Sequence, residues 1–569
     1  MRNLSIATLC CSVFLLIACE SLKPTPAASP LAQVAVASAS PEATQAGLQI
    51  LEAGGNAFDA AVAISAALGV AEPYSSGFGG GGLWLIHRAE DGKEIMIDAR
   101  ERAPLAAHRD MYLDADGNVQ EELVRWGALS AGIPGLPAGL VHLSENYGKL
   151  PLSTNLAPAI KLAEEGFAAT SIFSEFSAEF QQFLSHSEAA AALFLKDGKP
   201  FPEGELVVQK DLANVIRAIA AEGNAGFYQG ENAERLIAGT NAAGGIWSQE
   251  DFDTYKIVER EPIVFTYNGM RVVSSPPPSS GGVVMAQVLN ILEPYDLSTM
   301  TDGQKYHLVV EAMRRAYRDR AEYLGDTDFV EVPLARLSSK EYAAKQRQSI
   351  NLFAATSSGA LRPTSVDNPG GRDTTHFSVI DGDGNRVAGT LTINYPFGAC
   401  FVPPGTGVLL NNEMDDFSAK PGAANLYGLV GAEANAIAPG KRMLSSMTPT
   451  FVESADRIGI LGTPGGSRII SMVILSTLAF AEGANAEQMV DLPRYHHQYL
   501  PDKLEVEPDA LSSELRAALA AKGHTIAPQE IPWGNMHVVL KNKLSGQLDA
   551  ASDKRALGQA EVRTIGIPK

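Results

Sequence analysis

The sequence is poor in cysteine and has no long run of basic residues. Cys10, Cys11 and Cys19 lie within the first 19 residues, so only Cys400 remains in the body of the chain. A single thiol cannot form an internal disulfide, and the apolar surroundings of Cys400 indicate a small core residue. The net charge of −20 argues against nucleic-acid binding, because a phosphate backbone would be repelled.

The apolar stretch from Leu4 to Ala18 is too short to span a bilayer comfortably, and it follows the basic residue Arg2. These features predict a signal peptide over residues 1–18. The stretch ends in Leu-Ile-Ala-Cys, which resembles a bacterial lipobox, so Cys19 is the predicted lipidation site. An ordinary cleaved signal peptide is the alternative. The residue after Cys19 is Glu20 rather than Asp. By resemblance to known sorting patterns, the absence of Asp at this position favours the outer membrane, with the protein on the periplasmic side of the envelope.

Composition predicts a globular chain, since 45% of its residues are hydrophobic and 19% are charged. Residues 19–35 are rich in Pro, Ala and Ser, which predicts a flexible tether before the folded body. Helical spacing of apolar residues is expected over Gln45–Ala53, Asp59–Ala71 and Gln304–Leu324. The glycine run at 77–82 predicts unusual backbone geometry.

A polar segment at 356–373, rich in Gly, Pro and Ser, predicts an exposed and mobile linker. Two stretches of alternating apolar residues follow it, at 375–380 and 386–394. The Asp-Gly-Asp-Gly-Asn sequence between them superficially resembles a calcium loop, but it lacks the distal Glu and the flanking helices. A β-hairpin with a five-residue turn is therefore predicted.

The hairpin register places Thr374 opposite Thr392 on the same face of the sheet, because Ile380 would pair with Arg386. A threonine hydroxyl is a weak nucleophile, and a free α-amine on the same residue can act as its base. Such chemistry requires chain cleavage directly before the threonine. From the residues alone, Thr375 fits as well as Thr374, and a structural role for either one stays open.

Five sequence motifs, the first two of which lie in the predicted hairpin, occur in order along the chain. They are Asp373-Thr-Thr-His-Phe-Ser-Val-Ile-Asp381, Thr390-Leu-Thr-Ile-Asn394, Leu410-Asn-Asn-Glu-Met-Asp-Asp-Phe-Ser418, Leu444-Ser-Ser-Met-Thr-Pro449 and Gly462-Thr-Pro-Gly-Gly-Ser-Arg468. Their order and spacing resemble the γ-glutamyltransferase family, from about residue 35 to the end of the chain.

The resemblance implies an α+β fold, the four-layer αββα sandwich of the N-terminal-nucleophile hydrolases, built from two processed chains. Cleavage between Asp373 and Thr374 would give a large chain, 36–373, and a small catalytic chain, 374–569, intertwined in one domain. It also implies transfer of the γ-glutamyl group of glutathione and related compounds to water, an amino acid or a peptide. No metal and no organic cofactor are expected.

By the same resemblance, Thr374 is the nucleophile and Thr392 is its hydrogen-bond partner. Gly465 and Gly466 would present backbone N–H groups to a developing oxyanion.

The substrate-binding residues are also implied by the resemblance. Arg100 matches the arginine that binds the substrate α-carboxylate, with Arg102 as the nearest alternative. Glu413 and Asp416 match positions that hold the α-ammonium group, although some relatives have glutamine in place of Glu413. Further contacts are expected from Asn394, Ser445, Ser446 and Tyr427, the last of which matches a lid tyrosine.

Two alternatives remain at this stage. One is an acylase of the same superfamily that acts on glutaryl side chains. Such substrates lack the α-amine, so Glu413 and Asp416 favour γ-glutamyl substrates over them. The other is an unprocessed lipoprotein that binds γ-glutamyl ligands without catalysis.

Overall fold

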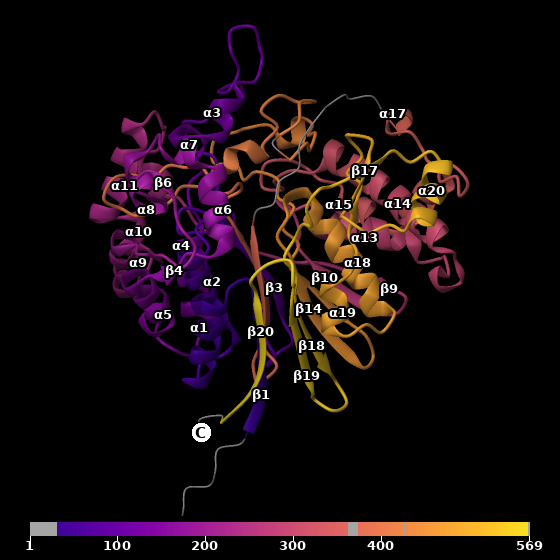
Figure 1. Cartoon of the computed structure of the whole chain (residues 1–569), viewed down its shortest axis with the longest axis horizontal. Helices are drawn as coiled ribbons and strands as arrows, with labels where there is room; N and C mark the ends of the chain where they lie inside the picture. The colour runs from indigo at the N-terminus through magenta and orange to yellow at the C-terminus, as the bar shows by residue number, and fades with distance from the viewer. Residues whose placement is uncertain (1–30, 362–373, 426, 567–569) are drawn as a thin grey trace, which may run out of the picture.

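The computed structural model describes residues 31–361, 374–425 and 427–566. Two antiparallel sheets pack face to face at its centre (Figure 1). The first sheet has the strand order β20-β1-β11-β12-β2-β3-β8, and the second has the order β19-β18-β14-β13-β10-β9. The predicted signal peptide, Cys19, most of the tether and Asp373 lie outside the described residues.

The strands of the first sheet are β1 (Leu31–Ser38), β2 (Gly81–His87), β3 (Glu94–Ala99), β8 (Val258–Arg260), β11 (Thr375–Ile380), β12 (Arg386–Thr392) and β20 (Gln559–Gly566). Those of the second sheet are β9 (Ile263–Tyr267), β10 (Met270–Ser274), β13 (Thr450–Glu453), β14 (Arg457–Gly462), β18 (His537–Asn542) and β19 (Leu548–Ser552). Each sheet therefore contains strands from both sides of the predicted cleavage site.

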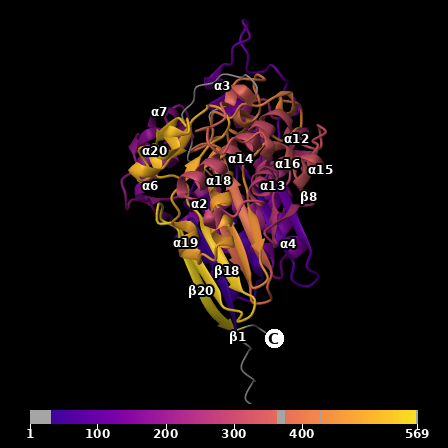
Figure 2. The same cartoon turned by 90° about the vertical axis from the view of Figure 1, so that its right-hand side faces the viewer.

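Helices cover the outer faces of both sheets (Figures 1 and 2). On the first sheet these include α1 (Pro41–Glu52), α2 (Ala57–Ala71), α4 (Leu136–Tyr147) and α5 (Leu152–Glu165), and on the second α13 (Gly281–Leu292), α14 (Asp302–Tyr323) and α18 (Ile469–Ala481). A central core that contains Ala37, Leu83, Phe451 and Val539 lies between the sheets. These layers confirm the predicted αββα architecture.

The remaining longer helices surround this sandwich. They are α6 (Ser171–Glu179), α8 (Glu188–Phe194), α9 (Lys210–Glu222), α11 (Gly230–Ala242), α16 (Lys340–Gln348) and α20 (Ser513–Ala521). Short helices are α3 (Glu121–Arg125), α7 (Gln181–Leu184), α10 (Ala225–Tyr228), α12 (Gln249–Asp253), α15 (Leu334–Leu337), α17 (Ser358–Leu361) and α19 (Ala486–Val490). Within the described ranges, no helix combines the length and the apolar character needed to cross a bilayer.

The three predicted helices are present as α1, α2 and α14, with earlier starts than the apolar spacing indicated. The side chain of Ser40 caps α1, and that of Asn56 caps α2 through the amides of Phe58 and Asp59. Caps of this kind extend a helix beyond its first apolar residue, which explains the difference. Cys400 is buried, as expected, and burial raises the pKa of its thiol.

The prediction for the glycine run was wrong in its physical reason. No glycine from 77 to 82 has a positive φ. Instead, a Cβ at Gly79 would collide with the carbonyl oxygen of Leu409, and one at Gly80 with the carbonyl oxygen of Thr392. The glycines therefore serve close approach of the backbone, which brings the start of β2 against the end of β12.

Candidate active site

The predicted hairpin is present, and its register sets the geometry around Thr374. Ile380 pairs with Arg386 and Thr375 with Leu391, as the five-residue turn requires. Thr374 Oγ1 consequently lies 3.4 Å from Thr392 Oγ1. Thr374 has a φ of 110°, which is unusual for a β-branched residue and stores strain of about 1–3 kcal/mol. Cutting the peptide bond before Thr374 removes this restriction on φ.

The structure distinguishes Thr374 from the adjacent Thr375 by their hydrogen bonds. The hydroxyl of Thr375 donates a hydrogen bond to Glu72 Oε2 at 2.8 Å, and its side chain is buried. The hydroxyl of Thr374 instead faces Thr392 at the border of a small cavity. Thr374 is therefore the threonine placed to meet a bound ligand, a distinction that the sequence pattern alone did not make.

We call this small cavity, of about 20 Å³, the first cavity. It is lined by nine of the eleven predicted catalytic and substrate-binding residues: Arg100, Thr374, Thr392, Asn394, Asp416, Tyr427, Ser445, Ser446 and Gly466. Glu413 lies behind Arg100 as its ion-pair partner, and Gly465 directly precedes Gly466. Segments from five separate parts of the sequence thus meet around one hydroxyl.

Arg100 occupies the polar end of the first cavity. Its Nη1 lies 2.6 Å from Glu413 Oε2, and its Nη2 lies 2.5 Å from Asp416 Oδ2. All three side chains are largely buried. The alternative residue Arg102 points elsewhere and donates to the carbonyl oxygens of Asp251 and Thr254. Of these two arginines, Arg100 is therefore the one that the fold places at the site.

The carboxyl groups outnumber the guanidinium groups around Arg100. Glu101 Oε2 lies 3.6 Å from Arg100 Nη1, so three carboxyl groups, with Glu413 and Asp416, surround this arginine. Burial raises the pKa of Glu101 to about 7, and it also raises the pKa values of Glu413 and Asp416. Arg320 is the second guanidinium that acts on Asp416. A cationic group of a ligand would balance the remaining negative charge.

Gly465 and Gly466 lead into α18 through a short 3₁₀ turn. Their φ values are 134° and 54°, which favour glycine over residues with a side chain. A Cβ at Gly466 would lie 2.6 Å from the ring of Tyr427. Tyr427 covers this turn and donates a hydrogen bond from its hydroxyl to the carbonyl oxygen of Asn394 at 2.5 Å.

The other predicted contact residues are held by hydrogen bonds. Asn394 has a φ of 75°, and its Nδ2 donates to the carbonyl oxygen of Asn412 at 2.9 Å. Ser446 Oγ accepts from Arg320 Nη2 at 3.2 Å, and Ser445 Oγ accepts from the amide of Met447. These bonds fix the walls of the first cavity before any ligand binds.

One buried cluster elsewhere brings metal-ligating residue types together. Side-chain atoms of His307, Glu311 and His524 lie within 4.8 Å of one another. The carboxylate of Glu311 is already bound by Arg314 and Arg315, and His307 Nδ1 lies 2.7 Å from His524 Nε2. Two adjacent guanidinium groups would repel a cation, so this cluster is suited to holding α14 in place rather than to binding a metal.

Comparison with known proteins identifies the family. A family model described as gamma-glutamyltranspeptidase matches residues 43–562, which is most of the chain. The chain belongs to the γ-glutamyltranspeptidase family. It is 45% identical over 493 residues to a glutathione hydrolase proenzyme of Pseudomonas sp. (strain A14), covering 85% of each chain. It is 42% identical over 527 residues to that of Escherichia coli (strain K12), covering 92% of this chain and 90% of the relative.

A solved structure supports the same fold. The cephalosporin acylase from Bacillus halodurans is similar with a TM-score of 0.83 at 29% identity, covering 95% of this chain and 98% of that chain. The γ-glutamyltranspeptidase family and this acylase therefore share the sandwich that holds Thr374. Fold alone does not separate their substrates, so the distinction rests on the residues of the first cavity.

Sequence patterns missed three buried charged residues around the site. Arg320 continues the spacing of Leu308, Ala312 and Ala316 on the apolar side of α14, so an arginine at that position was a usable signal. Glu101 and Glu72 offered no comparable signal, because each follows an apolar segment at a position where exposed acids are common.

Proposed function

We propose that this protein is a self-processing γ-glutamyltransferase that hydrolyses glutathione and related γ-glutamyl amides. It also passes the γ-glutamyl group to amino-acid or peptide acceptors. The observation that carries this proposal is the position of Thr374, whose hydroxyl faces Thr392 and borders a cavity with paired acidic and basic side chains. Related proteins that share most of the chain are named glutathione hydrolase proenzymes.

Recognition of the donor follows from the charges of the first cavity. The α-carboxylate of a γ-glutamyl group would take N–H donors of Arg100, with Ser445 and Ser446 nearby. Its α-ammonium group would lie against the carboxylates of Asp416 and Glu413. Burial raises the pKa of both acids and so favours their neutral forms. An ammonium group beside them has the opposite effect and favours their charged forms.

Chain cleavage before Thr374 frees its α-amine to act as the base. In the proposed reaction, Thr374 Oγ1 attacks the γ-carbonyl carbon while this amine accepts the hydroxyl proton. The backbone amides of Gly465 and Gly466 stabilise the oxyanion, and one such donor typically contributes ~3 kcal/mol. The leaving amine takes the proton, and a γ-glutamyl ester on Thr374 remains. Water or an acceptor amine then releases the group, without a metal or an organic cofactor.

Processing is tested with a denaturing gel and N-terminal sequencing of the purified protein. We expect a large chain and a small chain, the latter beginning at Thr374, and a single full-length band for Thr374→Ala. An intact wild-type chain would support the binding-only alternative. Cleavage that persists in Thr374→Ala would remove the nucleophile assignment.

The glutaryl acylase alternative is supported by the similarity to the cephalosporin acylase. The first cavity argues against it, because a glutaryl group brings a carboxylate without an ammonium group to a site already rich in carboxyl groups. Hydrolysis of γ-glutamyl and glutaryl p-nitroanilides is the direct comparison. We expect the γ-glutamyl compound to be preferred, and a strong glutaryl preference would overturn the assignment.

We also propose that the protein is exported and anchored by lipid at Cys19, on the periplasmic side of the bacterial outer membrane. The support is the apolar stretch that ends in Leu-Ile-Ala-Cys, followed by Glu20. Metabolic labelling with a tagged fatty acid, compared between wild type and Cys19→Ser, tests the anchor. Loss of label and release from membranes are expected for Cys19→Ser, and an unlabelled wild type would refute it.

A further inference from the structure

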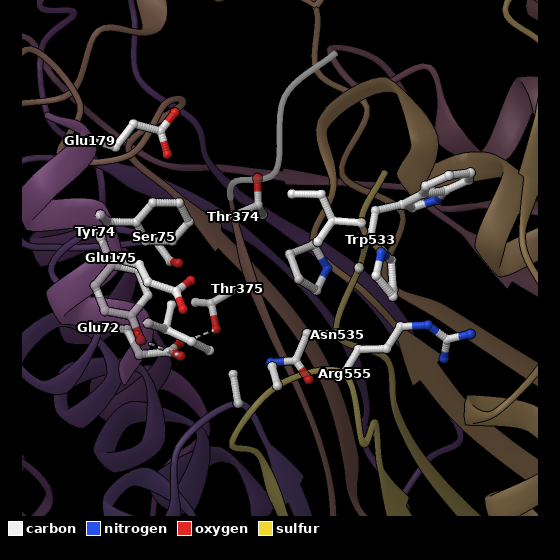
Figure 3. Close-up of a pocket in the computed structure, with 18 residues that line it drawn as sticks. Glu72, Tyr74, Ser75, Glu175, Glu179, Thr374, Thr375, Trp533, Asn535 and Arg555 are labelled. Carbon is white, nitrogen blue, oxygen red and sulfur yellow. Dashed lines mark hydrogen bonds between the residues drawn. The ribbon is translucent and has the colours of Figure 1, made fainter. Parts of the chain in front are cut away.

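A second cavity, of about 230 Å³, also borders Thr374 (Figure 3). Among the residues that the structure describes, Thr374 alone lines both this second cavity and the first cavity. If the γ-glutamyl group fills the first cavity, the amine side of its amide bond therefore faces the second. The amine that leaves and the acceptor amine that replaces it occupy this same position, because both bond to the same carbonyl carbon.

Acidic side chains stand on one wall of the second cavity. Glu175 and Glu179 lie one turn apart on α6 and are exposed, with no ion pair among the described residues. Figure 3 shows both on the wall that faces Arg555 across the cavity. Arg555 is already neutralised, since its guanidinium lies 2.8 Å from Glu507 and 3.2 Å from Asp553. The uncompensated charge of the second cavity is therefore negative.

The opposite wall offers apolar surface and unpaired polar atoms. Ile531 on this wall is 50% exposed, and Phe176 on α6 lines the same cavity, so both walls offer apolar surface against which a methylene chain can pack. Asn535 is 7% exposed, and its Oδ1 has no hydrogen-bond partner within the described ranges. The same holds for Trp533 Nε1, whose side chain is 2% exposed.

We propose that the second cavity binds the amine partner of the reaction and prefers amines that carry an additional positive charge on an aliphatic chain, such as basic amino acids. This inference rests on the proposed function. Glu175 and Glu179 would attract the cationic end, while Ile531 and Phe176 contact the chain. An exposed ion pair is worth roughly two- to fivefold in binding, so two carboxylates give a preference of roughly tenfold.

The transfer step balances without any further reactant. The neutral amine of the acceptor attacks the carbonyl carbon of the ester on Thr374. A C–N bond forms and the C–Oγ1 bond breaks. The proton lost by the attacking nitrogen passes through the α-amine of Thr374 to its Oγ1, which restores the free hydroxyl.

Arginine and citrulline make a matched pair of acceptors, because they have nearly the same shape and differ in side-chain charge. The measured quantity is the ratio of kcat/KM values for these acceptors, with γ-glutamyl-p-nitroanilide as the donor. We expect arginine to be preferred roughly tenfold at low salt, and less at high salt. The ratio should fall to about one in the double variant Glu175→Gln, Glu179→Gln. Because each ratio is internal to one variant, a change in overall turnover does not affect it.

Glu188→Gln is the control, since it removes an exposed charge from α8 outside the second cavity and should keep the wild-type ratio. Each single variant should lose about half of the preference on a logarithmic scale. The single variants therefore still test the proposal if the double variant does not process. A wild-type ratio near one, or a ratio unchanged in the Gln variants, would overturn this inference alone. Absence of donor hydrolysis by the wild type would instead remove the proposed function.

Discussion

Arg100 Nη1 lies 2.6 Å from Glu413 Oε2 at the buried end of the first cavity. The same guanidinium reaches Asp416. Arg100, proposed to bind the anionic group of a ligand, is therefore paired with the two acids proposed to bind its cationic group. A zwitterionic γ-glutamyl group enters by exchange of partners, because it supplies both an anion for Arg100 and a cation for the released carboxylates. A glutaryl group supplies only the anion and leaves buried carboxylates without a counter-ion.

Substitution of Arg100 tests this exchange. Arg100→Lys keeps the positive charge but loses the forked geometry that contacts Glu413 and Asp416 together. We expect kcat/KM for γ-glutamyl-p-nitroanilide to fall about 10- to 100-fold, the cost of one charge-assisted hydrogen bond. Arg102→Lys is the control, because Arg102 binds carbonyl oxygens elsewhere. Equal effects of the two substitutions would contradict the placement of Arg100.

Removal of the Thr392 hydroxyl should slow processing. Thr392→Val keeps the shape of the side chain but deletes the group 3.4 Å from Thr374 Oγ1. We expect cleavage to slow by roughly tenfold, the typical effect of one lost hydrogen bond. The measurement is the fraction of uncleaved precursor against time on a denaturing gel. Thr392→Ser retains the hydroxyl and should process at near the wild-type rate, and equal rates for Val and Ser would refute this role.

A side chain at Gly466 should block the site. Its Cβ would lie 2.6 Å from the ring of Tyr427, and its φ of 54° disfavours alanine. We expect Gly466→Ala to lose about 100-fold in kcat, as for a displaced oxyanion donor. Gly483→Ala is the control, because Gly483 also has a positive φ, of 94°, but no neighbour within 4 Å of its Cβ. That change should cost only about 1 kcal/mol of stability and preserve turnover.

Because the carboxyl group of Glu72 is buried, we expect the free energy of unfolding to depend on pH. Burial raises the pKa of Glu72 to about 7 from an ordinary value of 4.5. Below pH 4.5 the folded and unfolded chains are both protonated. Between 4.5 and 7 only the unfolded chain ionises, so the free energy of unfolding falls by up to about 3 kcal/mol and stays low above pH 7.

Glu72→Gln removes this titration and keeps an oxygen that accepts the Thr375 hydroxyl. Urea unfolding is measured in the uncleaved Thr374→Ala background, so that one covalent chain is compared at each pH. We expect the advantage of Gln over Glu at position 72 to grow from pH 4.5 to 8. Exposed Glu188→Gln should show no such trend. Parallel curves for Glu72→Gln and its parent would show that Glu72 titrates normally.

Local features of this fold follow from the sequence. The five-residue turn between Ile380 and Arg386 sets the hairpin register, and the register alone places Thr374 beside Thr392. Alternation of apolar residues and short turns are local properties, so a single sequence contains them. The choice of Thr374 over Thr375 required the contact between Thr375 and Glu72, which are 303 positions apart.

The features that could not be predicted from the sequence are contacts between residues that are far apart in the chain. The second cavity combines α6 with Trp533 and Arg555, which are far apart in the chain. The glycine run was expected to have unusual backbone geometry, yet a side chain at Gly79 or Gly80 is excluded because the carbonyl oxygens of Leu409 and Thr392 lie close to them. Such approaches depend on tertiary packing, and residue type alone does not distinguish them from turns.

The strand order determines how the two processed chains can separate and refold. β1, from before the proposed cleavage site, lies between β20 and β11, and β12 lies beside β2. The two processed chains thus cannot part without dismantling the first sheet. Before the cut, pairing of these strands is intramolecular; after it, reassembly becomes a second-order encounter that slows with dilution. After the cut, refolding therefore depends on protein concentration, and at high dilution the persistence of the mature protein depends on how slowly it unfolds.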